Sequence, residues 1–137
     1  MFKSLDHIAI VVHDIDDALS FYQEQLGLSV VVDEVIEDAG VRLTHLDLGN
    51  IHLQLVQPLS EDHPLQEHLA TRGEGLHHLC LYVDDVSKTI VDLPSHGLKA
   101  MDKPPHSGPN GRSAAFIDPS TTRGVIWEMT SDPSERE

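Results

Sequence analysis

Apolar and polar residues alternate in short runs along most of this chain, a pattern typical of strands that are buried on one face. Each half opens with such a run, at residues 5–12 and 77–83. Three further strand-like runs are expected in each half, at 29–36, 41–48 and 51–57 and then at 98–102, 113–117 and 124–130.

The opening strand of each half is followed by apolar residues at helical spacing. Asp14 is the expected N-cap of the first helix, and Gly27 its end. Asp84 or Asp85 is expected to cap the second helix, which Pro94 should shorten or distort because proline donates no backbone hydrogen bond. Both halves therefore predict one strand, one helix and three strands.

The two halves resemble each other in sequence. The stretches "DHIAIVVHDIDDALSFYQEQLGL" and "HHLCLYVDDVSKTIVDLPSHGLKA" align His7 with His78 at an offset of 71 residues, and Gly27 with Gly97 at an offset of 70. Such a repeat fixes the architecture. The prediction is an α+β fold of two βαβββ modules whose strands form one cup-shaped mixed sheet.

The length of 137 residues favours a single domain, 1–137. Module one is expected at 1–57 and module two at 76–130. The linker between them, 58–75, should hold a short amphipathic helix, and the polar tail 131–137 is expected to be disordered.

Two adjacent histidines stand in "GEGLHHLCLYVDD". Successive side chains of a strand point to opposite faces, so His78 shares a face with Cys80 while His77 points the other way. His7 alternates in the same manner with Ala9. The repeat therefore predicts that His7 and His78 occupy equivalent positions.

The last strand of each module carries a polar residue among apolar neighbours. "NIHLQLV" aligns with "GVIWEMT", which places Gln54 on Glu128 at an offset of 74 residues. A buried glutamate is costly unless it is paired or binds a metal. A salt bridge from Arg112 or Arg123 is the alternative explanation for Glu128.

Two histidines and two oxygen donors thus fall at repeat-equivalent positions. His7, Gln54, His78 and Glu128 are the predicted ligands of one divalent ion of the Mn, Fe, Co, Ni or Zn class. On an octahedral ion this set leaves two adjacent positions for water or substrate, which suits Lewis-acid chemistry. No residue is assigned to an organic cofactor.

The sequence around the remaining histidines gives less indication of their roles. For His45 and His52, a place in the cup and a place on the outer sheet face both stay open. "PPHSGPNGRSAAF" is interpreted as a flexible loop. Polar or loop-like surroundings predict solvated side chains for His63, His68, His96 and His106.

Composition and charge exclude several classes of partner. The net charge of −14 leaves no basic stripe for nucleic-acid phosphates, and no apolar stretch reaches the length of a membrane span. The N-terminus has neither the basic region nor the apolar core of a secretory signal. One cysteine, Cys80, cannot form an intrachain disulfide. A cytoplasmic protein is expected.

Four stretches resemble the vicinal oxygen chelate superfamily, and within it the methylmalonyl-CoA epimerase family. They are "LDHIAIVV", "LQLVQPLSED", "GEGLHHLCLYVDDV" and "GPNGRSAAFIDPSTTRGVIWEM". The resemblance implies metal ligands at His7, Gln54, His78 and Glu128, with Glu128 also acting as acid and base. It implies epimerisation at the α-carbon of an acyl-CoA thioester through a metal-stabilised enolate, and a homodimer.

The chain departs from that family at Leu43, where "GVRL" aligns with a second glutamate of some epimerases. Three other functions stay open. They are a lactoylglutathione lyase (glyoxalase I), a dioxygenase that uses His7, His78 and Glu128 alone, and a binding protein without catalysis.

Overall fold

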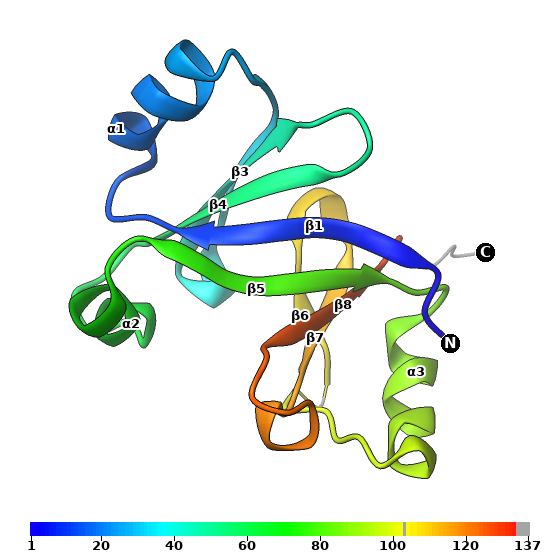
Figure 1. Cartoon of the computed structure of the whole chain (residues 1–137). Coiled ribbons are helices and arrows are strands. Elements are labelled where there is room, and N and C mark those ends of the chain that lie inside the picture. Colours follow the sequence, from blue (N-terminus) through cyan, green and yellow to red (C-terminus); the bar gives the residue numbers. More distant parts are fainter. Residues whose placement is uncertain (103, 134–137) are drawn as a thin grey trace. The chain divides into compact units, whose positions relative to one another are not determined.

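The computed structural model describes residues 1–102 and 104–133. The chain folds into two compact units (Figure 1): the N-module, His7–His77, and the C-module, His78–Glu137 with Met1–Asp6. The first elements are β1 (Ser4–Val11), α1 (Ile15–Leu19), η1 (Ser20–Gln25), β2 (Ser29–Ile36), η2 (Glu37–Ala39), β3 (Val41–Asp47), β4 (His52–Pro58) and α2 (Leu65–Arg72). They are followed by β5 (Gly75–Tyr82), α3 (Val86–Asp92), η3 (Leu93–His96), β6 (His106–Ser107), η4 (Pro109–Gly111), β7 (Ser113–Ile117), η5 (Pro119–Thr121) and β8 (Trp127–Ser131).

The strands of the two modules follow the same order. In the N-module the order is β1-β4-β3-β2, with β1 parallel to β4 and the other pairs antiparallel. In the C-module the order is β5-β8-β7-β6, with β5 parallel to β8 and the other pairs antiparallel. The predicted pair of βαβββ modules is confirmed.

The helices begin and end where the sequence indicates. The side chains of Asp14 and Asp85 accept hydrogen bonds from Asp17 N–H and Lys88 N–H, at 3.2 and 3.1 Å, as N-caps do. α1 continues as the π-helical turn η1, and α3 tightens into the 3-10 turn η3 at Pro94.

One predicted strand is absent. Residues 98–102 form only a single bridge, from Ala100 to Ile117, and the short strand β6 pairs with β7 instead. Pro104 and Pro105 have no amide hydrogen, so they cannot continue a ladder. The prediction of a strand over 98–102 was therefore wrong.

The last strand begins and ends later than predicted. Arg123 and Gly124 have φ angles of 62° and 86° in a turn, so β8 begins at Trp127 rather than at residue 124. Ser131 belongs to β8 and is buried, and its hydroxyl accepts a hydrogen bond from Val86 N–H at 3.1 Å. The prediction of a disordered tail over 131–137 is therefore wrong for Ser131. Residues 134–137 lie outside the described part.

Each module buries apolar side chains beneath its helix. In the N-module α1 covers Leu46, Leu53 and Leu55; in the C-module α3 covers Ala115 and Met129. A second cluster fills the opposite face of the N-module sheet and comprises Ala9, Ile36, Val41, Leu43 and Val56.

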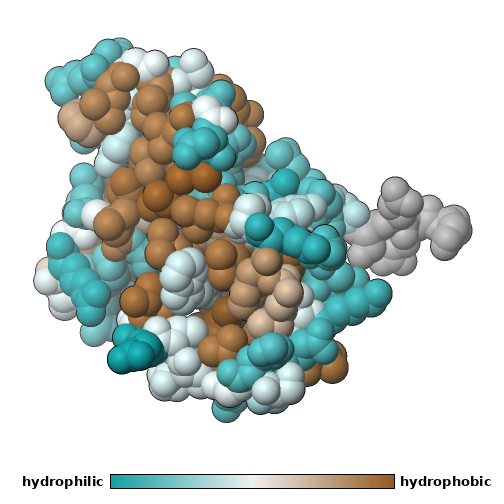
Figure 2. Space-filling model, turned by 45° about the vertical axis from the view of Figure 1, so that its right-hand side comes forward, coloured by the Kyte–Doolittle hydropathy of each residue, from teal (hydrophilic) through white to brown (hydrophobic). Residues whose placement is uncertain are grey.

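Large hydrophobic side chains also reach the surface (Figure 2), with Leu76 and Val91 among the most exposed of the described residues. None of the helices in the described part combines the length and the apolar character of a membrane span.

Candidate metal centre

Strand register brings His7 and Gln54 to one face of the N-module sheet. Gln54 of β4 lies between Ala9 of β1 and His45 of β3. His7 stands two residues before Ala9, so its side chain points to the same face. Both His7 and Gln54 are buried, and the His7 ring packs against that of His45 at a centroid distance of 5.2 Å.

A chain of hydrogen bonds orients the Gln54 amide. Nε2 of Gln54 lies 2.9 Å from Nε2 of His45, and Nδ1 of His45 lies 2.9 Å from Nδ1 of His52. An amide nitrogen can only donate, so His45 accepts at Nε2 and donates from Nδ1 to His52. The Gln54 carbonyl oxygen, the atom that would bind a metal, lies outside this contact. His45 and His52 thus belong to the face that carries Gln54.

The C-module repeats this register with other residues. Glu128 of β8 lies between Cys80 of β5 and Phe116 of β7, and His78 stands two residues before Cys80. Phe116 takes the place of His45, and its ring packs against the His78 ring at 5.1 Å. His78 and Glu128 therefore share one face, as the repeat predicts.

The geometry of His78 and Glu128 suits a metal ion. Nε2 of His78 lies 3.1 Å from Oε1 of Glu128, and the two side chains are only 5% and 9% exposed. Around an octahedral ion with bonds of about 2.1 Å, adjacent ligand atoms lie about 3 Å apart. The pair fits neighbouring positions on one ion, and a buried carboxylate needs such a partner.

The second oxygen of Glu128 contacts a histidine for which the sequence predicts only solvation. Nε2 of His106 lies 3.1 Å from Oε2 of Glu128, and Nδ1 of His106 lies 3.1 Å from Oδ2 of Asp102. Burial lowers the pKa of His106, but hydrogen bonds and charges from Glu128 and Asp102 outweigh it, so the pKa is raised overall. The prediction that His106 is solvated is therefore wrong.

The two arginines that the sequence offered as partners of Glu128 have other surroundings. Arg112 pairs with Asp6 at 2.8 Å and with Asp132 at 3.1 Å, and Arg123 is exposed. These pairs also hold the segment that was expected to be a flexible loop, where Gly108 N–H donates to Arg112 O at 2.8 Å. That segment contains β6, η4 and β7.

Three other histidines have contacts within the N-module. The His77 ring packs against His68 of α2 at 5.1 Å, on the face of β5 opposite to His78. His63 accepts a hydrogen bond from Leu65 N–H at Nδ1 and donates from Nε2 to Ala39 O. The predicted solvation thus holds for the exposed His96 alone among the four histidines named for it.

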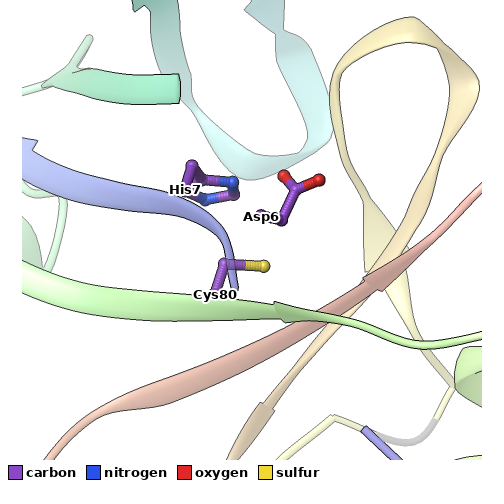
Figure 3. Close-up of side chains that lie close together, drawn as sticks. All are labelled: Asp6, His7 and Cys80. Carbon is purple, nitrogen blue, oxygen red and sulfur yellow. The ribbon is translucent and has the colours of Figure 1, made fainter. Parts of the chain in front are cut away.

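Cys80 is a weaker candidate for metal binding. Its sulfur lies within 4.8 Å of an Asp6 carboxylate oxygen (Figure 3). Burial, followed by the charge of Glu128, raises the pKa of Cys80 far above its ordinary value. The thiol therefore keeps its proton at neutral pH. Asp6 is already paired with Arg112.

The sequence did not predict that His106 and Asp102 contact Glu128 or one another. Both lie in a segment rich in proline and glycine, where no periodicity links them to Glu128. A histidine four residues after an aspartate was the only local signal.

Comparison with known proteins identifies the superfamily of this chain. Residues 6–116 match the family described as the Glyoxalase/Bleomycin resistance protein/Dioxygenase superfamily. The chain belongs to this superfamily. Its relatives include the uncharacterized protein YqjC of Bacillus subtilis, which is 37% identical over 91% of this chain and 89% of that protein. The mitochondrial methylmalonyl-CoA epimerase of Mus musculus is 31% identical over 91% of this chain and 71% of that enzyme.

A solved member of the superfamily has the same fold. It is a Streptomyces coelicolor methylmalonyl-CoA epimerase in which leucine replaces a glutamate, in complex with 2-nitronate-propionyl-CoA. The TM-score is 0.89 and the identity is 32%, over 100% of this chain and 99% of that one. The predicted vicinal oxygen chelate fold is confirmed.

Proposed function

We propose that this chain is a metal-dependent isomerase that epimerises the α-carbon of an acyl-CoA thioester such as methylmalonyl-CoA. The observation that carries the proposal is the buried Glu128 carboxylate beside His78, at the position where the repeat has Gln54. Epimerases among the relatives support the choice of reaction.

The proposed ion is held by His7 and Gln54 of the N-module and by His78 and Glu128 of the C-module. Two imidazoles, an amide oxygen and a carboxylate suit a divalent ion of the Mn, Fe, Co, Ni or Zn class. Such an ion supplies Lewis-acid polarisation of the thioester carbonyl and so makes the α-proton more acidic.

Glu128 is the proposed group that moves the proton. A carboxylate is a weak base, so it must be held close to the α-carbon and the developing charge must be stabilised. Coordination through Oε1 would restrain Glu128 in that place. The acid on the opposite face is proposed to be His45, His52 or a water molecule.

Leu43 cannot move a proton, and it is buried with Ala9 and Val56. It stands where the sequence aligns with a second glutamate of some epimerases. The Streptomyces coelicolor variant that has leucine in place of a glutamate is in complex with an acyl-CoA analogue. A leucine in an epimerase is thus compatible with binding of an acyl-CoA.

The proposal includes a homodimer in the cytoplasm. The free and buried Cys80 is compatible with a reducing compartment. Sedimentation of the purified chain would give its mass in solution.

Racemic methylmalonyl-CoA in D₂O tests the substrate class. With Co²⁺ present, proton NMR is expected to show loss of the α-proton signal as deuterium enters at the α-carbon. The hemithioacetal of methylglyoxal and glutathione, followed by ultraviolet absorbance, is expected to stay unconverted. The reverse outcome would make lactoylglutathione lyase the better assignment.

A further inference from the structure

We infer that His106, oriented by Asp102, is a positioning residue that holds Oε2 of Glu128 and leaves Oε1 as the metal ligand. This inference rests on the proposed function and adds a residue outside the four ligands. It concerns the C-module alone.

Three contacts fix the His106 ring. Its face stacks on Phe116, with centroids 5.3 Å apart and planes inclined by 21°. Nδ1 lies 3.1 Å from Oδ2 of Asp102, and Nε2 lies 3.1 Å from Oε2 of Glu128. Stacking sets the plane of the ring and Asp102 sets its rotation, so Nε2 is aimed at Glu128.

Asp102 is itself held in place. Its Oδ2 also accepts a hydrogen bond from the backbone N–H of Phe116 at 2.7 Å. The segment before β6 is thereby tied to β7 at Phe116, the residue whose Cα pairs with Glu128. Asp102 and His106 thus form a rigid support rather than two mobile surface side chains.

The two oxygens of Glu128 have different partners. Oε1 lies 3.1 Å from Nε2 of His78, while Oε2 is occupied by His106. A carboxylate that could rotate freely could bind an ion through both oxygens and take one more coordination position. With Oε2 held, Glu128 binds through one oxygen, and two adjacent positions stay open for a chelating substrate.

The N-module offers a parallel. There His45, backed by His52, contacts the amide nitrogen of Gln54 and so directs the carbonyl oxygen elsewhere. In each module an imidazole outside the ligand set orients the side chain that supplies oxygen. Partners of this kind fix the geometry of metal ligands in proteins.

Variants at His106 test the inference. His106→Phe keeps a ring that can stack on Phe116 but removes both nitrogens. His106→Gln places an amide N–H within reach of Glu128. His96→Phe, at an exposed histidine of the same module, is the matched control. Co²⁺ affinity is measured by competition with a chromophoric chelator, and the visible absorption of bound Co²⁺ reports its coordination number.

His106→Phe is expected to weaken Co²⁺ binding by about 10- to 100-fold, the usual effect of losing such a partner, and to change the Co²⁺ spectrum. In turnover, kcat is expected to fall. His106→Gln should recover most of the affinity and the wild-type spectrum, and His96→Phe should match wild type. A merely structural role would not be rescued by glutamine.

Wild-type affinity and spectrum in His106→Phe would overturn the inference, and so would a His106→Gln variant as weak as His106→Phe. Should His106→Phe fail to fold, His106→Leu replaces it, because leucine also removes both ring nitrogens. A His106→Leu affinity and Co²⁺ spectrum equal to wild type would then refute the inference. The proposed function is tested separately on the wild-type protein. If wild type binds Co²⁺ and exchanges the α-proton, the proposed function stands whatever the His106 variants do. If wild type does neither, the proposed function and the role of His106 both fail.

Discussion

Replacing Glu128 with glutamine is expected to slow α-proton exchange by about 100-fold or more, the usual range for the loss of a general acid or base. Co²⁺ binding is expected to weaken much less, because an amide oxygen can still coordinate, as Gln54 is proposed to do. The volume of the side chain hardly changes. The rate is measured by NMR in D₂O and the affinity by chelator competition.

Glu74→Gln is the matched control for Glu128→Gln. Glu74 is exposed, and its carboxylate accepts a hydrogen bond from His13 N–H at the surface of the N-module. This control is expected to keep wild-type exchange. Near-native exchange in a metal-loaded Glu128→Gln variant would mean that Glu128 is only a ligand and that another group moves the proton.

Replacing His78 with alanine is expected to weaken Co²⁺ binding by about 100-fold or more. Removal of a group that only hydrogen-bonds to a ligand costs up to about 100-fold in affinity. Removal of His78 takes away a direct ligand, so the loss is expected to be at least as large. Replacing the adjacent His77 is expected to leave affinity within a factor of about two. His77 packs on His68 of α2, whereas His78 contacts Glu128.

Bound metal is measured by elemental analysis of each dialysed variant, and circular dichroism verifies that both variants fold. Equal loss of metal from His77→Ala and His78→Ala would contradict the assignment of faces on β5. Retention of metal in His78→Ala would remove this residue from the ligand set.

Period-two patterning predicted most of the fold, because β1–β4 and β7 bury alternating side chains in the apolar clusters. The repeat predicted the register as well. Gln54 and Glu128 occupy equivalent places between their neighbouring strands, although their alignment rested on two short apolar runs. Alternation along the strand alone predicted which side chains of β5 share a face. It places His77 and His78 on opposite faces.

Local patterns could not predict what tertiary contacts decide. His106 reaches Glu128 only because Asp102 and β6 are drawn to β7 across a segment without periodicity. The single bridge that residues 98–102 form, from Ala100 to Ile117, is likewise decided by tertiary contacts. Hydrogen bonding of Gln54 to His45 depends on which strand lies beside β4, and a sequence pattern gives only the face.

Metal titration of α-proton exchange tests whether this chain is a metal-dependent epimerase. The protein is stripped with a chelator, dialysed, and given Co²⁺ in steps with racemic methylmalonyl-CoA in D₂O, while NMR follows deuterium at the α-carbon. Exchange is predicted to be at background in the stripped protein and to rise in proportion to bound Co²⁺ until one ion is bound per chain. Full exchange by the stripped protein, or none at saturating Co²⁺, would contradict a metal-dependent epimerase.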